Sequence, residues 1–286
     1  MTNNPLSNLL DEALGFPHDS KGGALFSGGG GNRLIIVEDC VDTSGEFVLY
    51  HLLKRSLAPQ SLDVVIFLSF SRPFSHYDRI LRKMGCNLVV QKEKKRLLFF
   101  DVQRIGIYYL SIWDEMVLHP IRKCVISLRD KGKTREDLLL ELYGKVHKAI
   151  EVCQTSEGLQ NITIMIDDVS LMEIDADGSS NLVLNFLHYC YSLTTQFSCS
   201  LVTLNHEDVY STANRPTLLS QLEHLADVVI KAEPLATGLA SDVHGQLTVL
   251  NKGVGDIFGT LRNKVSNFQF RIKDSGAEYF YPGNRT

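Results

Sequence analysis

The sequence lacks the features that would place it among membrane, disulfide-rich or secreted proteins. None of its apolar runs reaches the roughly 18 residues that a membrane-spanning helix needs. Its six cysteines are scattered without a C-x-x-C pair, which favours reduced, buried thiols in an intracellular protein over a disulfide framework. The first residues carry neither the basic nor the apolar region of a signal peptide, so we expect no secretion and no membrane partner.

Strong charge of one sign and metal-binding motifs are also missing. The 286 residues include 29 basic and 33 acidic ones, and the resulting net charge of −4 excludes a polybasic protein that coats DNA. A local basic face is still compatible with this balance. None of the nine histidines forms an H-x-x-x-H pair or stands at metal spacing from a cysteine, so we expect no metal site.

The sequence does contain a regular alternation of apolar strands and amphipathic helices. Residues 1–32 look like a flexible N-terminal segment, because the glycine run at 28–31 precedes a strand instead of following one. The pattern predicts strands at 33–40, 62–70, 88–90, 97–102, 161–166, 200–204, 227–231, 246–251 and 267–273, and helices at 46–57, 74–84, 134–153, 181–194 and 216–225.

Strands that are apolar throughout are typical of parallel sheets covered by helices on both faces. The final strands instead alternate polar and apolar residues, which favours antiparallel pairing at a sheet edge. We therefore predict that residues 33–286 form one α/β domain, a doubly wound and mostly parallel sheet with antiparallel C-terminal edge strands.

A phosphate-binding loop belongs between the first strand and the first helix of such a sheet, in the pattern G-x-x-x-x-G-K-[ST]. When that pattern is laid on this sequence, Cys40 stands at the first glycine, Glu46 at the lysine and Phe47 at the serine or threonine; only Gly45 matches. A carboxylate ~4 Å from a phosphate charge costs on the order of 4 kcal/mol at an effective dielectric of 20. Phe47 cannot ligate Mg²⁺. We expect a degenerate loop that binds no nucleotide cofactor.

The second element of such nucleotide sites is an aspartate that ends an apolar strand and holds Mg²⁺. Asp167 follows the apolar run 162–166 in that manner. Alternatively, Asp167 or Asp168 caps the turn after the strand through bonds to backbone N–H groups. The loss of the ligands at Glu46 and Phe47 favours capping and a chain without its own ATPase activity. An active NTPase with an atypical phosphate loop that uses Asp167 is the alternative.

Basic residues concentrate in two stretches on either side of Tyr108, Tyr109 and Trp113. The stretch 82–96 contains Arg82, Lys83, Lys92, Lys94, Lys95 and Arg96 against one acid, and the stretch 122–135 contains Arg122, Lys123, Arg129, Lys131, Lys133 and Arg135 against one acid. Basic patches beside aromatic residues are typical of RNA-binding faces. A solvated surface over core aromatics is the alternative, and both interpretations stay open.

Several short strings resemble the family of the sixth subunit of the Elongator complex. They are FSHY at 74–77, LATG at 235–238, the specific DVHGQL at 242–247 and FRIKD at 270–274, within a resemblance that runs from about residue 33 to 280. The resemblance implies a RecA-like, P-loop NTPase-type fold with a degenerate phosphate loop. It also implies a heterohexameric ring with Elongator subunits four and five that works with the catalytic subcomplex, in the cytoplasm and the nucleus.

The same resemblance implies what the assembly does. Elongator modifies uridine at the wobble position of tRNA and is linked to transcription elongation and histone acetylation, and the ring binds tRNA and controls its release. In such a ring the loop after the strand at 200–204 would face the centre, so Arg215 joins the second basic stretch as a candidate tRNA contact, with Asn205, His206, Tyr210 and Asn214 beside it. A pure scaffold that never touches RNA is a further hypothesis.

One glycine of the family strings allows a local prediction. Gly245 lies between two predicted strands, so we expect it to supply the positive φ of a hairpin turn. The neighbouring His244 then has a structural role as readily as a functional one.

Overall fold

The computed structural model describes residues 9–16, 33–102, 134–155, 161–210, 217–236, 238, 240, 242–255 and 261–283. Within these residues nine strands form one sheet in the order β3-β2-β4-β5-β1-β6-β7-β8-β9. The parallel strands are β1 (Leu34–Asp39), β2 (Val64–Ser69), β3 (Leu97–Asp101), β4 (Ile162–Ile166), β5 (Ser200–His206) and β6 (Val228–Glu233). Three antiparallel strands follow, β7 (Gly245–Gly255), β8 (Leu261–Lys273) and β9 (Gly276–Phe280). This arrangement confirms the predicted mostly parallel sheet with antiparallel C-terminal strands.

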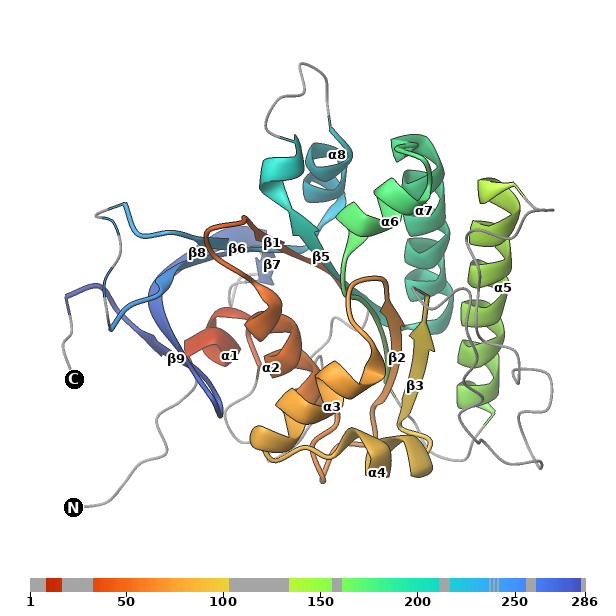
Figure 1. Ribbon diagram of the computed structural model, residues 1–286, viewed down its shortest axis with the longest axis horizontal. Coiled ribbons are helices and arrows are strands. Elements are labelled where there is room, and N and C mark those ends of the chain that lie inside the picture. Colours follow the sequence, from red (N-terminus) through yellow and green to blue (C-terminus); the bar gives the residue numbers. More distant parts are fainter. Residues whose placement is uncertain are drawn as a thin grey trace.

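Helices cover both faces of the sheet (Figure 1). One face carries α5 (Arg135–Gln154), α6 (Val169–Asp175), α7 (Ser180–Phe197) and α8 (Leu218–Leu225), and the other carries α1 (Leu9–Ala13), α2 (Glu46–Ser56), α3 (Phe74–Lys83) and α4 (Leu88–Glu93). A short 3-10 helix, η1 (Glu207–Tyr210), continues from β5.

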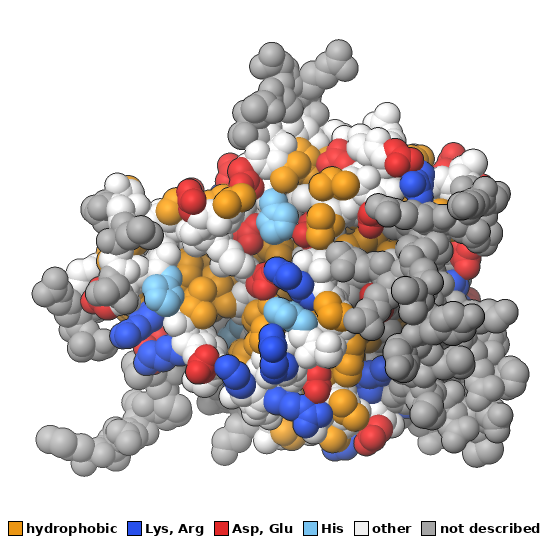
Figure 2. All heavy atoms as spheres, in the orientation of Figure 1, with side chains coloured by type: hydrophobic (Ala, Val, Ile, Leu, Met, Phe, Trp, Pro, Cys, Tyr) orange, Lys and Arg blue, Asp and Glu red, His pale blue; other side chains and the backbone are white. Residues whose placement is uncertain are grey.

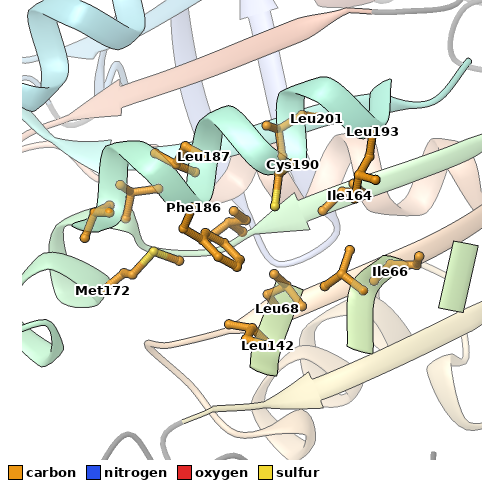
Figure 3. Close-up of a cluster of buried hydrophobic side chains, with 14 of the residues drawn as sticks. Ile66, Leu68, Leu142, Ile164, Met172, Phe186, Leu187, Cys190, Leu193 and Leu201 are labelled. Atoms are coloured by element: carbon orange, nitrogen blue, oxygen red, sulfur yellow. The ribbon is translucent and has the colours of Figure 1, made fainter. Parts of the chain in front are cut away.

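Alternate residues of each strand face the two helical layers, because side chains along a strand point to opposite sides. Ile66 and Ile164 belong to the core beneath α5 and α7, whereas Val65 and Met165 belong to the core beneath α2 and α3. Figure 3 shows Phe186 and other side chains of α7 directed at the first of these layers. The central strands β1, β2 and β4 are buried along their whole length, which is why their sequences are largely apolar.

The predicted strand at 88–90 is wrong. These residues form the first turn of α4, whose N-cap Asn87 accepts a hydrogen bond from the Val90 amide through its side chain. Leu88 is fully buried against the α2 side of the sheet. A three-residue apolar run contains too little periodicity to distinguish a helix from a strand.

The predicted role of Gly245 is also wrong. Gly245 begins β7, and its φ lies outside the positive range that a hairpin turn would require. A Cβ at this position would lie 2.7 Å from the carbonyl oxygen of Glu233 and 2.8 Å from the Phe270 ring. Glycine is needed here because a neighbouring strand and an aromatic ring approach the backbone closely. The adjacent His244 accepts a hydrogen bond from the Ile272 amide, a structural contact.

The described part of the segment 1–32 is packed, in contrast to the expected flexible segment. Leu10 and Leu14 are buried in the core on the α2 side. Asp11 pairs with Arg55 at 2.6 Å and with His51 at 2.8 Å, and Arg33 donates to the carbonyl oxygen of Leu14. Residues 9–16 therefore belong to the domain that follows them. The rest of the expected segment lies outside the described residues.

Across the part of the chain that the structure describes, no helix combines the length and the apolarity that crossing a bilayer requires.

Candidate functional site

The candidate site lies at the carboxyl ends of three neighbouring strands, β4, β5 and β1. Ligands of open α/β sheets bind at this edge. Asp39 ends β1, Asp167 and Asp168 follow β4, and His206 ends β5. The three aspartates are almost completely buried, so each of them needs partners inside the protein.

The backbone amides of the loop between β1 and α2 donate hydrogen bonds to other groups of the same chain. The Thr43 amide donates to the carbonyl oxygen of Cys40, the Val41 amide donates to the Asp208 carboxylate at 3.0 Å, and the Gly45 amide donates to the Asp39 carboxylate at 2.7 Å. In a phosphate loop, backbone N–H groups of this kind are directed at the nucleotide. Here the chain's own carboxylates take the place that a phosphate would need.

The two residues after Gly45 are also engaged elsewhere. Glu46 begins α2 and accepts a hydrogen bond from the Tyr50 hydroxyl at 2.5 Å. Phe47 is buried, and its ring centre lies 4.5 Å from that of Phe270. Glu46 therefore places a negative charge where a lysine would meet the phosphates, and Phe47 packs in the hydrophobic core. These residues do not fit a nucleotide or its Mg²⁺.

Asp167 fastens the turn after the neighbouring strand, β2. Its carboxylate accepts hydrogen bonds from the Ser69 hydroxyl at 2.6 Å, the Phe70 amide at 2.6 Å, the Ser71 amide at 3.1 Å and the Tyr77 hydroxyl at 2.5 Å. Burial raises the pKa of Asp167 to about 6, although these hydrogen bonds oppose that shift. Both oxygens are used, so the carboxylate is part of a structural network.

Asp168 caps the helix that follows it. Its Oδ1 accepts a hydrogen bond from the Leu171 amide at 2.7 Å, at the N-terminus of α6. The capping interpretation thus describes both aspartates, with one difference. Asp168 caps its own turn, whereas Asp167 binds the backbone of a turn about a hundred residues earlier in the chain.

His206 joins two of the strand ends. Its Nδ1 lies 2.5 Å from Asp39 Oδ1 and its Nε2 lies 3.0 Å from Asp168 Oδ2. The hydrogen bonds to Asp168 and to Asp39 raise the pKa of His206 to about 10, so the ring is a cation that donates from both nitrogens at neutral pH. The centre of the site is thus a bridge of one imidazolium between two carboxylates.

The sequence placed His206 among the candidate RNA contacts and did not single out Asp39. The position of Asp39 offered a signal, since a polar residue that ends a buried strand faces the same sheet edge as Asp167. Other residues of that candidate loop are also engaged. Asn205 is buried beside Val37, and the Tyr210 hydroxyl donates to Glu173 at 2.8 Å. Asn214 and Arg215 lie outside the described residues.

A hollow of about 420 Å³ opens beside this loop, between η1, α8 and β6. Its walls include Glu207, Asp208, Glu223 and Lys231. The Lys231 ammonium lies 2.6 Å from Glu223 and 2.8 Å from the buried Glu38. Burial raises the pKa of Glu38 to about 7, and the Lys231 charge opposes this shift. The hollow carries more acidic than basic groups and suits a cation better than a phosphate.

The predicted tRNA contacts are largely outside the described residues. This applies to Arg122, Lys123, Arg129, Lys131, Lys133 and Arg215. Arg135, which begins α5, pairs with Asp177 at 2.9 Å. In the first basic stretch, Arg96 is half-buried and donates to backbone oxygens that include that of Ser56, so it has a structural role. Among the described residues, no group of three or more His, Cys, Asp or Glu side chains is arranged to hold a metal ion.

Comparison with known proteins identifies a family that this chain matches and relatives with similar sequences. The family described as "Elongation complex protein 6" matches residues 28–274. This chain belongs to that family. Elongation complex protein 6 relatives include the mouse protein named Elongator complex protein 6, which is 26% identical over 244 residues, or 84% of this chain and 87% of the mouse protein. A zebrafish protein of the same name is 26% identical over 259 residues, or 88% of this chain and 91% of that protein.

Solved structures resemble this chain in fold. A KaiC-like protein from Pyrococcus horikoshii has a TM-score of 0.55 at 9% identity, and the match covers 87% of this chain and 89% of that protein. An uncharacterized protein from the same organism, solved with an unknown peptide, has a TM-score of 0.57 at 17% identity, and the match covers 88% of this chain and 92% of that protein. The fold is RecA-like, which confirms the prediction, and the chain is an Elongator subunit.

Proposed function

We propose that this Elongator subunit is a non-catalytic member of a heterohexameric RecA-like ring, with subunits four and five, which supports tRNA binding and release during wobble-uridine modification. One observation carries the non-catalytic part. The Gly45 amide, which a phosphate loop would direct at a nucleotide, donates to the Asp39 carboxylate at 2.7 Å. A phosphate could reach this amide only after displacing an internal anion.

The charge balance of the site supports the same proposal. Asp39, Asp168 and Glu46 surround the loop, and His206 is the cation that lies between the first two. A triphosphate would therefore meet carboxylates where catalytic members of this fold provide a lysine and a metal ion. The family's place in Elongator supports the ring, the tRNA role and the presence in cytoplasm and nucleus, along with the link to transcription elongation and histone acetylation.

The competing function is an NTPase that uses Asp167 for Mg²⁺. This carboxylate lies at the expected strand end, but it accepts bonds from two hydroxyl groups and two amides. Binding a metal would require breaking contacts that hold the turn after β2. The geometry therefore favours a structural role for Asp167.

Calorimetric titration of the purified chain with Mg-ATP tests the non-catalytic part. We expect no heat of binding, and a micromolar dissociation constant would overturn the proposal. The tRNA part is tested by comparing tRNA binding by the co-expressed ring with and without this subunit. Equal affinity at equal ring stability would contradict it.

A further inference from the structure

We propose that the exposed face of α3 and the loop before it bind the phosphodiester backbone of RNA, through Arg72 and Arg79 on either side of His76. This inference rests on the proposed tRNA function and names a surface for it. Residues 71–83 contain four cations and one acid, a net charge of +3 in a chain whose total is −4. Figure 2 shows Lys and Arg side chains gathered over the centre and lower part of this face, where α2 and α3 lie.

The four cations of this segment differ in their partners. Arg82 pairs with Asp78 at 2.7 Å, and Lys83 pairs with Asp274 at 3.3 Å. Arg72 and Arg79 are exposed, and neither forms an ion pair with any residue in the described part of the chain. Their guanidinium groups therefore remain available for an external anion. Guanidinium groups match phosphate oxygens in shape and donor number.

The two arginines converge on one place. Burial lowers the pKa of His76, and the nearby charges of Arg72 and Arg79 lower it further against the opposing charge of Glu46. His76 Nε2 also lies 3.2 Å from the Tyr50 hydroxyl. The charges of both arginines thus act on one half-buried histidine. Of the charges that act on this ring, those of Arg72 and Arg79 are positive and that of Glu46 is negative.

The start of α3 adds to the positive potential. Its N-cap is Pro73, which offers no side-chain bond to the first turn, and that turn has no acidic residue. The partial positive charge of the helix N-terminus is therefore not compensated by the helix itself. Lys92 lies over the ring of Phe74, the first residue of α3, 4.6 Å from the ring centre. The N-terminus of α3, the two arginines and Lys92 each make the electrostatic potential at this surface more positive.

The charges around the α3 surface favour RNA over a protein partner, and they favour this side of the molecule over the acidic hollow. On the opposite side of the β1–α2 loop, the hollow lined by Glu207, Asp208 and Glu223 would repel a nucleic acid. The exposed residues of α3 are Ser75, Arg79, Arg82 and Lys83, without an apolar side chain among them. A protein interface of ordinary size has a less charged core. Phosphate contacts of this kind bind by charge and do not read sequence.

Fluorescence anisotropy with a labelled tRNA transcript, at several salt concentrations, tests this surface on the full chain and on the co-expressed ring. The variant is Arg72→Gln with Arg79→Gln. The control is Lys148→Gln with Lys264→Gln, which removes the same charge from exposed positions on α5 and β8. We expect the variant to lose roughly tenfold in affinity at low salt and its log–log salt slope to decrease by about 1.4 to 1.8, with thermal unfolding unchanged.

Each other outcome decides against the surface or the function it rests on. If the ring binds tRNA and the variant matches the control in affinity and slope, the α3 surface is not the contact, and the proposed tRNA function stands. If neither the chain nor the ring binds tRNA at low salt, the tRNA part of the proposed function fails as well. If the variant prevents ring assembly while the control does not, the surface is a protein interface and the inference is overturned.

Discussion

Nδ1 of His206 lies 2.5 Å from Oδ1 of Asp39, across the ends of two paired strands, β5 and β1. The second ring nitrogen reaches Asp168 at the end of a third strand, β4. A protonated histidine therefore joins three strands at the edge of the sheet where ligands of open α/β folds bind. Asp39 in turn holds the Gly45 amide. The first two predictions test this arrangement.

Stability should depend on the charge of His206. Its pKa rises from an ordinary value of 6.5 to about 10 on folding, so its contribution is complete below pH 6.5 and is lost as the pH rises through about 10. We expect His206→Gln to lower the free energy of unfolding by about 2 kcal/mol at pH 6.5 and by much less at pH 10.5. Urea unfolding at both pH values measures this. A difference that does not change with pH would show that the imidazolium bridge contributes nothing.

Removal of the Asp39 carboxylate should destabilise the fold without creating a phosphate site. Asp39→Ala removes the buried acceptor of the Gly45 amide and of His206 Nδ1, while Nε2 keeps Asp168; we expect a cost of about 2–3 kcal/mol. The matched control is Asp42→Ala, an exposed carboxylate of the same loop. We expect no gain in Mg-ATP binding for either variant by calorimetry, because Glu46 and Phe47 remain. Nucleotide binding by the Asp39 variant would mean that this carboxylate alone prevents the loop from binding a nucleotide.

The network around Asp167 should respond to the loss of one donor. Tyr77→Phe removes the 2.5 Å hydrogen bond from a buried carboxylate, and we expect a loss of about 1–2 kcal/mol in unfolding free energy. Tyr189→Phe, at an exposed position on α7, is the control and should change little. Equal melting temperatures for both variants would show that the Tyr77 hydrogen bond to Asp167 does not contribute to stability.

The backbone contact at Gly245 should exclude any side chain. We expect Gly245→Ala to cost about 1–3 kcal/mol, since its Cβ would overlap the Glu233 carbonyl oxygen and the Phe270 ring. At Gly253, also in β7, a Cβ would have no neighbouring atom within 4 Å, so Gly253→Ala should be nearly neutral. Denaturant midpoints of the two variants give the comparison. Similar midpoints would mean that β7 shifts to accommodate the new methyl group.

Several features of this protein were determined locally, and the sequence was enough to predict them. The helix predicted at 134–153 is α5, which begins with a capping box of Thr134 and Asp137, and such a cap needs only residues that are three positions apart. The buried strands were recognisable because burial on both faces leaves continuous apolar runs. The substitutions at Glu46 and Phe47 were visible as soon as the strand and helix around them were placed. The short DVHGQL string indicated the family whose match over residues 28–274 then showed the membership.

Only the tertiary structure determined how the site is closed. Asp39 and His206 are 167 positions apart, and they meet because β1 pairs with β5. From the sequence, Asp167 could be a metal ligand or a cap; the pairing of β4 with β2 brings the Ser69 hydroxyl and the Phe70 and Ser71 amides to its carboxylate. Buried polar groups take whichever partners the strand order brings within hydrogen-bonding distance, and strand order is a property of the packed sheet that no local pattern contains.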